Sequence, residues 1–225
     1  MTLIESLIQE GWLKTPEIIE TFKKIKRADF LPAHLSFAGQ NFGGPEDMKD
    51  LAELNEALPI GFGQTISQPL VVAFILEQLQ PKLGDKILDI GSGSGWTTAL
   101  LAEIVGDKGK IFAIEIVPEL VEFGRKNTGK YNFVEKGIAE FILADGSKGY
   151  PNIAFRPELA EGFDKILASA TANEIPNFWK KQLRVGGRIV APIGNSIWLL
   201  IKKTEQEFEE IEYPGFVFVP LVSKQ

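Results

Sequence analysis

Lys86-Ile-Leu-Asp-Ile-Gly-Ser-Gly-Ser-Gly95 joins a short apolar run to three glycines at alternate positions, directly before a stretch that predicts a helix. Glycines adopt positive φ readily and let a ligand approach the backbone, and the first turn of a helix presents unpaired N–H groups. A second apolar run, Lys110-Ile-Phe-Ala-Ile-Glu115, ends in a carboxylate, which is the expected acceptor for two ribose hydroxyls. Together, the two stretches predict a ribonucleoside cofactor.

Strand-like and helix-like stretches alternate from residue 86 onward, which is typical of a parallel sheet with crossover helices. The expected strands cover residues 86–90, 110–115, 141–144, 163–168 and 188–192, and the expected helices cover 97–105, 118–127 and 175–182. Two further strands, at 197–202 and 216–220, have only the acid-rich residues 205–212 between them. The predicted fold class is therefore α/β, an open and mostly parallel sheet with an antiparallel C-terminal edge.

The first 80 residues follow a different pattern. Apolar spacing and the pair Thr15-Pro16 predict two short helices, and a third helix is expected at 70–79. Glycines, prolines and acids interrupt residues 32–63, where we expect a loop with one short helix. We therefore expect an N-terminal helical segment with a functional loop at 1–80 and a cofactor-binding core at 81–225, within one compact unit.

The composition excludes several classes of protein. The net charge of −6 comes from interleaved acids and bases, so a nucleic-acid partner is not expected. The chain has no cysteine and a single histidine, His34. Disulfides are therefore excluded, and metal sites and Ser-His-Asp triads lack the residues that they need. No basic leader and no apolar run of membrane-spanning length occurs. We expect a soluble, cytoplasmic protein without a membrane or metal partner.

The spacing of the glycines favours one cofactor over another. A dinucleotide site needs its third glycine one residue later, where this chain has Trp96, and a tryptophan there obstructs the pyrophosphate. S-adenosylmethionine carries no phosphates but has an ammonium group, which suits the acidic residue Asp89 at the end of the strand. A nicotinamide-dependent oxidoreductase is the alternative from another class, and retention of NAD would favour it.

Two other segments carry candidate site residues. Asp145 ends another predicted strand, and in Asp145-Gly-Ser-Lys-Gly-Tyr150 it is either an acceptor for an adenine amino group or part of an ordinary Asp-Gly turn. The polar segment at 57–69 places Thr65 and Ser67 just ahead of a helix. Ser67 can cap that helix, contact a substrate, or do both.

Seven motifs that occur in the family's order resemble the protein-L-isoaspartate (D-aspartate) O-methyltransferase family over nearly the whole chain. Leu58-Pro-Ile-Gly-Phe-Gly-Gln-Thr-Ile-Ser-Gln-Pro69 is the most specific of them, because glycine turns after Asp89 occur in many unrelated methyltransferases. The other motifs are Arg27-Ala-Asp-Phe-Leu-Pro32, the glycine turn itself, Asp145-Gly-Ser-Lys-Gly-Tyr150, Glu174-Ile-Pro176, Arg184-Val-Gly-Gly-Arg188 and Val217-Phe-Val-Pro-Leu221.

The resemblance implies a Rossmann-like class I methyltransferase with an N-terminal helical extension. It implies methyl transfer from S-adenosyl-L-methionine, with S-adenosyl-L-homocysteine as product, to the carboxylate of L-isoaspartyl or D-aspartyl residues in damaged proteins. It makes Ser67 the active-site serine. The implied cofactor contacts are Thr65, Ile66, Ser67, Gly91, Ser92, Gly93, Gly95, Glu115, Ile116, Asp145 and Gly146.

The chain also departs from the family pattern. Glu53 and Asn55 stand where the family usually shows a tyrosine and an aspartate, Thr171 lies in an altered run after the fourth strand, and residues 152–162 form a longer stretch than usual. A methyltransferase of the same fold that acts on another peptide carboxylate therefore remains an alternative, as does a non-catalytic module that only binds S-adenosylmethionine. We expect a monomer whose partners are isoaspartyl peptides and proteins.

Overall fold

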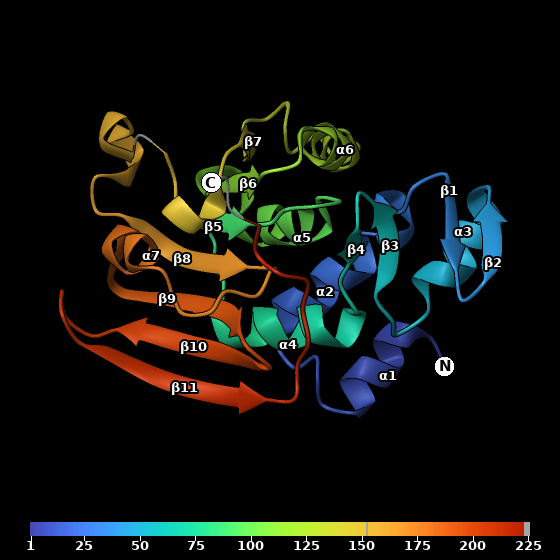
Figure 1. Cartoon of the computed structure of the whole chain (residues 1–225), viewed down its shortest axis with the longest axis horizontal. Coiled ribbons are helices and arrows are strands. Elements are labelled where there is room, and N and C mark those ends of the chain that lie inside the picture. Colours follow the sequence, from blue (N-terminus) through green and yellow to red (C-terminus); the bar gives the residue numbers. More distant parts are fainter. Residues whose placement is uncertain (152, 223–225) are drawn as a thin grey trace.

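A computed structural model describes residues 1–151 and 153–222 and contains a central sheet of seven strands (Figure 1). The strand order is β11-β10-β9-β8-β5-β6-β7. Strands β5 to β9 pair parallel with one another, whereas β10 pairs antiparallel with both β9 and β11. This arrangement confirms the predicted fold class. The strands are β5 (Lys86–Ile90), β6 (Lys110–Glu115), β7 (Ala139–Leu143), β8 (Phe163–Ala168), β9 (Leu183–Ile193), β10 (Ser196–Lys202) and β11 (Phe208–Pro214).

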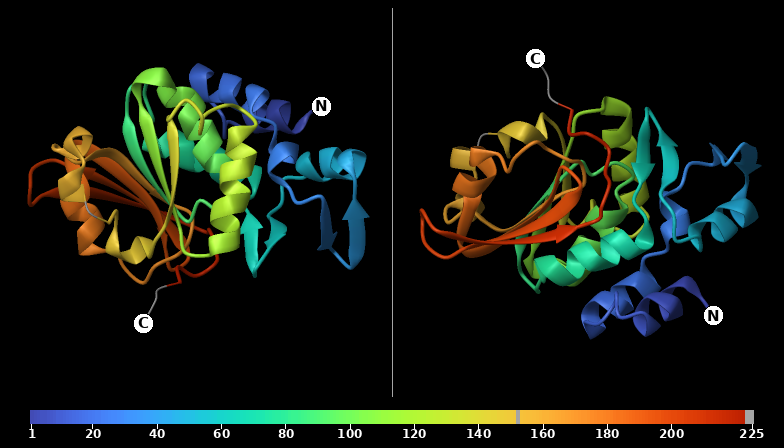
Figure 2. Two further views of the ribbon diagram at one scale, coloured as in Figure 1. Left: turned by 90° about the horizontal axis from the view of Figure 1, so that it is seen from above. Right: turned by 60° about the horizontal axis from the view of Figure 1, so that its bottom comes forward.

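Helices cover both faces of the sheet because its parallel strands are apolar on both sides. Ile87 belongs to the core cluster beneath α4 (Pro69–Leu79), α5 (Trp96–Val105) and α6 (Pro118–Gly129). Its neighbour Leu88 belongs to the cluster on the opposite face, beneath α7 (Asn177–Gln182). Figure 2 shows these layers from two further directions. Three short 3₁₀ turns join β7 to β8: η3 (Gly146–Lys148), η4 (Ile153–Phe155) and η5 (Pro157–Leu159); a fourth, η2 (Gly106–Lys108), follows α5.

The N-terminal helices form an outer layer on α4 and α5. These helices, α1 (Leu3–Gln9) and α2 (Pro16–Lys24), confirm the predicted pair. Glu77 on α4 holds the connection between them, because its carboxylate accepts hydrogen bonds from the backbone of Lys14 and from the backbone and hydroxyl of Thr15. The apolar faces of α1 and α2 share one core cluster with α4, α5 and α6. No helix in the described part of the chain is long and apolar enough to cross a membrane.

The prediction of a loop at 32–63 is wrong, although the one short helix expected there is present. The expected helix is α3 (Pro45–Ala52), but two antiparallel hairpins flank it. They pair β1 (His34–Phe37) with β2 (Gln40–Gly43), and β3 (Leu58–Gly61) with β4 (Gln64–Ile66); a 3₁₀ turn, η1 (Arg27–Phe30), precedes them. These strands have three or four residues, and glycines at their turns take the positive φ that tight hairpins require.

The predicted strand at 216–220 is also wrong. The last strand is β11, which lies in the acid-rich segment expected to be a connection. Phe208, Ile211 and Tyr213 are partly buried, whereas the glutamates between them are exposed, as suits a strand at the edge of a sheet. The residues after β11 run back across the sheet to its carboxyl edge (Figure 1), where Thr171 and Pro220 form a single bridge.

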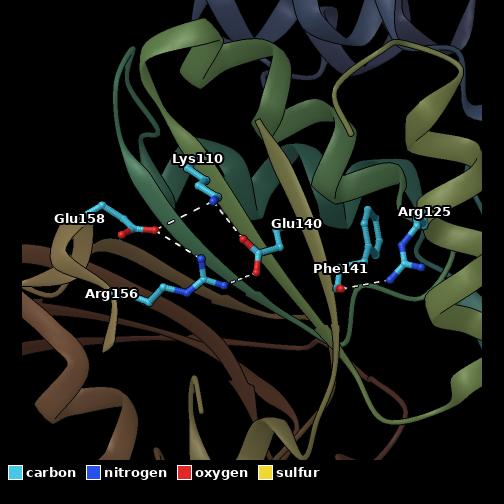
Figure 3. Close-up of polar contacts among 6 residues, drawn as sticks. All are labelled: Lys110, Arg125, Glu140, Phe141, Arg156 and Glu158. Atoms are coloured by element: carbon cyan, nitrogen blue, oxygen red, sulfur yellow. Dashed lines mark hydrogen bonds and ion pairs between the residues drawn. The ribbon is translucent and has the colours of Figure 1, made fainter. Parts of the chain in front are cut away.

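An ion-pair network fastens the long segment before β8 to the amino ends of β6 and β7 (Figure 3). Lys110 Nζ lies 2.9 Å from Glu140 Oε2, and Arg156 pairs with both Glu140 and Glu158. The network stands at the edge of the sheet opposite the glycine loop, so it contributes to anchoring and not to the cofactor site. Asn152, the first residue of the lengthened stretch, lies outside the described residues.

Candidate functional site

A cavity opens at the carboxyl ends of β5, β6 and β8, where the strand order reverses. From β5 the chain proceeds to β6 and β7 on one side, and later to β8 and β9 on the other; ligands of open α/β sheets bind at such a reversal. The floor of the cavity is the glycine loop, and its cover consists of the β3–β4 hairpin and residues 219–222. The volume is about 200 Å³, below the roughly 300–1,000 Å³ of most ligand sites.

The first two glycines of the loop lie in this floor. Gly91 and Gly93 have φ values of +79° and +50°, and both line the cavity. The loop is held against β6, because the N–H groups of Gly91 and Ser92 both donate to Ile114 O, at 2.8 and 3.1 Å. The structure therefore presents glycine backbone, without Cβ atoms, towards the space where a ligand sits.

Gly95 has a different environment from the other two. It does not line the cavity, and a Cβ atom at this position would lie 2.6 Å from Gly124 O and 2.6 Å from Thr128 Oγ1 on α6. Thr128 Oγ1 donates to Gly95 O at 3.2 Å, and Asn127 Nδ2 donates to Ser94 O at 3.1 Å. The third glycine lets the loop and α6 approach closely, a packing contact that the spacing of the motif did not reveal.

Glu115 lies at the end of β6 and lines the cavity. Its carboxylate accepts hydrogen bonds from the N–H groups of Gly93 at 3.0 Å, Ile116 at 2.7 Å and Val117 at 3.0 Å. Because a carboxylate offers about four lone-pair directions, these three bonds fix its orientation and leave it able to accept from a ligand hydroxyl. Ile116 lines the cavity beside it.

Asp145 is beside the cavity and does not line it. Its Oδ1 accepts from the N–H and the hydroxyl of Ser147, at 3.0 and 2.6 Å, so the carboxylate caps the turn η3. The next residue, Gly146, does line the cavity, and its carbonyl accepts from Trp179 Nε1 at 2.8 Å. The turn that follows β7 therefore places Gly146 at the cavity, where the sequence predicted it, and Asp145 holds the backbone of that turn.

The β3–β4 hairpin brings Thr65, Ile66 and Ser67 over the cavity. Ser67 does not cap α4, whose N-cap is Gln68 with no side-chain hydrogen bond. No hydrogen bond occupies the Ser67 hydroxyl within residues 1–151 and 153–222. At the tip of the hairpin, Phe62 has φ of +55° and is 58% exposed, although it too lines the cavity. Gly63 beside it also has a positive φ, as both central residues of a tight two-residue hairpin turn require.

Beneath the glycine loop lies a buried acid. Asp89 is fully buried, and its Oδ2 accepts from Thr98 Oγ1 at 2.6 Å. Burial, together with the charge of Glu115, raises the pKa of Asp89 to about 6, and the Thr98 hydrogen bond opposes that rise. Asp89 is therefore mostly ionised at neutral pH, and its negative potential suits a ligand that carries positive charge.

Two buried donors lack partners beside the cavity. In the described part of the chain, neither Ser92 Oγ nor Trp96 Nε1 makes a hydrogen bond, and both residues are cavity-lining. Buried polar atoms are normally satisfied, so both atoms are unusual. Residues 219–222, which lie in and after the Val217–Leu221 motif, line the cavity without having been predicted there, and Trp96 was expected only to obstruct a pyrophosphate.

Comparison with known proteins agrees with this geometry. The model of the family described as protein-L-isoaspartate(D-aspartate) O-methyltransferase matches residues 1–225. A protein-L-isoaspartate O-methyltransferase of Methanopyrus kandleri is 34% identical over 227 residues, covering 99% of this chain and 91% of the relative. Another from Ignicoccus hospitalis is 35% identical, covering 99% and 97%.

The chain belongs to the protein-L-isoaspartate (D-aspartate) O-methyltransferase family.

A solved structure shares the fold of this family member. It is a Plasmodium falciparum protein assigned as an isoaspartate O-methyltransferase, in complex with S-adenosyl-L-homocysteine, with a TM-score of 0.82 and 22% identity over 99% of this chain and 97% of its own. As a member of the family, the chain is an S-adenosylmethionine-dependent methyltransferase that repairs isoaspartyl residues. The family assignment decides against the nicotinamide alternative.

Three of the departures from the family pattern, Glu53, Asn55 and Thr171, lie outside the cavity lining. Glu53 Oε2 accepts from the N–H of Leu3 at 3.1 Å, and Asn55 Oδ1 accepts from the N–H of Leu70 at 3.0 Å. The backbone of Thr171 pairs with the C-terminal segment, donating to Val219 O at 2.8 Å. Each therefore has a structural contact of its own, and none removes a group from the cavity.

Proposed function

We propose that methyl transfer to the isoaspartyl carboxylate takes place in the cavity beneath the β3–β4 hairpin, with Ser67 facing the reacting groups. The observation that carries this proposal is the convergence of three separate segments on one cavity: the glycine loop, Glu115 and the hairpin that carries Ser67. Only the first two resemble a general nucleotide site. The hairpin adds a hydroxyl whose hydrogen-bonding capacity is unused in the described chain.

The cofactor contacts follow from the groups that line the cavity. Glu115 is placed to accept from the ribose hydroxyls, and the loop at Gly91 and Gly93 receives the methionine portion, whose ammonium group suits the negative potential there. Gly146, positioned by Asp145, lies on the adenine side. When bound, S-adenosylmethionine supplies a sulfonium methyl group as the electrophile.

The acceptor needs little activation by this chain. Its carboxylate has a reference pKa of about 4 and is ionised at neutral pH, so no general base is required. Opposite charges are lost as the oxygen attacks, and a site that excludes water therefore favours the reaction. Alignment can contribute about 7–11 kcal/mol in well-oriented reactions. The Ser67 hydroxyl orients the attacking carboxylate, and the hairpin and residues 219–222 exclude water.

Methyl transfer from labelled S-adenosylmethionine to paired isoaspartyl and normal aspartyl peptides tests the proposal. We expect transfer to the isoaspartyl peptide alone. Ser67→Ala should lower kcat by about 10- to 100-fold, the range for a lost orienting contact, with unchanged affinity for S-adenosylhomocysteine. Ser36→Ala is the matched control, because Ser36 lies on β1, outside the cavity lining. Equal methylation of both peptides, or full activity of Ser67→Ala, contradicts the proposal.

We also propose that residues 1–80 and 81–225 act as one compact unit, that the enzyme is a monomer and that it works in the cytoplasm. The core cluster shared by α1, α2, α4 and α5 supports the first point. The absence of cysteine is in keeping with a reducing compartment. Light scattering after size-exclusion chromatography tests the monomer, which a mass near twice 24.9 kDa would contradict.

A further inference from the structure

Arg27 is a buried cation with an unusual set of partners. Only 6% of the residue is exposed, and no carboxylate within the described residues pairs with its guanidinium. Instead, Nη1 donates to Leu54 O at 2.9 Å, and Nη2 donates to Glu56 O at 2.6 Å and Ser67 O at 3.2 Å. A longer contact, at 3.4 Å, joins Nη1 to Ala52 O. All its hydrogen bonds in the described part of the chain therefore go to backbone carbonyls, and Nε makes none.

These carbonyls lie on both sides of the β3–β4 hairpin. Leu54 and Glu56 come just before β3, whereas Ser67 directly follows β4. One planar guanidinium thus closes the base of the hairpin and holds the backbone of Ser67 itself. The fixed fork geometry of arginine allows several carbonyls to be bound at once, which the single ammonium of lysine does not reproduce.

A second contact links Arg27 to the floor of the cavity. Its guanidinium carbon lies 5.5 Å from the centre of the Trp96 ring, within the range of a cation–π interaction. Trp96 is the first residue of α5, follows the glycine loop and lines the cavity. Arg27 therefore bridges the hairpin above the cavity and the residue that ends the loop below it.

An apolar side chain at this position would fill the space but would leave the carbonyls of Leu54, Glu56 and Ser67 without these hydrogen bonds. Although burial lowers the pKa of Arg27 to about 9, the group remains protonated at neutral pH and keeps its donors. The chemistry of the site therefore points to a role for the fork in setting the hairpin, beyond filling space.

We propose that Arg27 is a positioning residue for methyl transfer, acting through the backbone of Ser67 and the base of the β3–β4 hairpin. This inference rests on the role of Ser67 proposed above. Arg27 does not line the cavity and touches neither reacting group. It sets the height and direction of the Ser67 hydroxyl over the floor, and so affects turnover more than cofactor affinity.

Three variants test the inference: R27M, R27K and R188M. Arg188 is the matched control, since its Nη1 donates to the carbonyl of Gln78 at 2.8 Å, near the end of α4 and away from the hairpin. The measurements are kcat and KM with an isoaspartyl peptide, the Kd of S-adenosylhomocysteine by calorimetry, the melting temperature, and hydrogen exchange of the amides at 58–66.

We expect R27M to lower kcat about 10- to 100-fold, with the Kd of S-adenosylhomocysteine within about threefold of wild type. R27K, which keeps the charge and lacks the fork, should fall between R27M and wild type. Amides of the hairpin should exchange faster in R27M, and those of β5 and β6 should not. R188M should lower the melting temperature and leave kcat unchanged.

The double variant R27M/S67A separates this inference from the proposed function. If Arg27 acts through Ser67, the double variant is at most about threefold slower than the slower single variant, because residues of one unit are not additive. The inference is overturned if the kcat losses of the two single variants multiply in the double variant, or if R27M keeps the kcat of wild type. It is also overturned if R27M loses turnover and cofactor affinity equally, or if neither R27M nor R27K folds. Full activity of S67A alone contradicts the role of Ser67, while the exchange and kcat of R27M still report on the hairpin.

Discussion

Gly93 and Gly95 share a positive φ but have different surroundings, so alanine at the two positions should have different consequences. A left-handed φ costs an L-residue about 1–2 kcal/mol, and both substitutions carry that cost. At Gly95 the added Cβ also lies 2.6 Å from Gly124 O and 3.0 Å from Gly124 Cα, which are backbone atoms of α6. Overpacking of this kind adds about 1–3 kcal/mol. At Gly93 the nearest atom is Ile60 Cδ1, at 3.4 Å, the end of a side chain.

We therefore expect Gly95→Ala to lower the free energy of unfolding by about 2–5 kcal/mol and Gly93→Ala by about 1–2 kcal/mol. For cofactor affinity the order of the two effects should reverse, because only Gly93 lines the cavity. Gly93→Ala should weaken the binding of S-adenosylhomocysteine by about tenfold or more, and Gly95→Ala should weaken it by less than about threefold. Each factor of ten in affinity corresponds to roughly 1.4 kcal/mol. Urea unfolding and calorimetry give the two quantities. Equal destabilisation, or a larger loss of affinity in Gly95→Ala, would refute the assignment.

Substitutions of Glu115, Asp89 and Phe62 give three further predictions. Glu115→Gln keeps one acceptor oxygen for three N–H groups, so calorimetry should show about tenfold weaker S-adenosylhomocysteine binding; unchanged affinity contradicts the assignment. Because the pKa of Asp89 is raised from 3.8 to about 6 on folding, its contribution to stability is full below pH 4 and falls by about 3 kcal/mol as pH rises to about 6. Asp89→Asn should remove this pH dependence of the free energy of unfolding, measured by urea unfolding from pH 4 to 7. An unchanged pH dependence would show that other groups cause it. Phe62→Gly should relieve about 1 kcal/mol of strain and raise KM for the peptide; an unaltered KM excludes contact with the acceptor.

The central fold is readable from the sequence because its strands are continuous apolar runs with sharp ends. Residues 86–90, 110–115 and 163–168 are buried on both faces and were predicted with the bounds that β5, β6 and β8 have. Edge strands lack this signal. In β11 exposed glutamates separate the partly buried positions, and the whole segment therefore resembles a charged connection. The short hairpins at 34–43 and 58–66 depend on turns and on packing against distant residues.

The site shows a similar division. Glycine spacing and a carboxylate at the end of a strand identify a cofactor cavity, since both features are local. Spacing cannot tell whether a glycine faces a ligand or a helix, and the contact between Gly95 and Gly124 joins positions far apart in the chain. The arrival of residues 219–222 over the cavity, and the bonds from Arg27 to the base of the hairpin, likewise depend on tertiary structure.

A crystal structure with bound S-adenosylhomocysteine tests the central claim most directly. We expect the ribose hydroxyls on the Glu115 carboxylate, the amino-acid portion against the loop at Gly91 and Gly93, and the Ser67 hydroxyl facing the sulfur across the remaining space. Density for the ligand elsewhere on the molecule, with Glu115 still bonded only to Gly93, Ile116 and Val117, would contradict it.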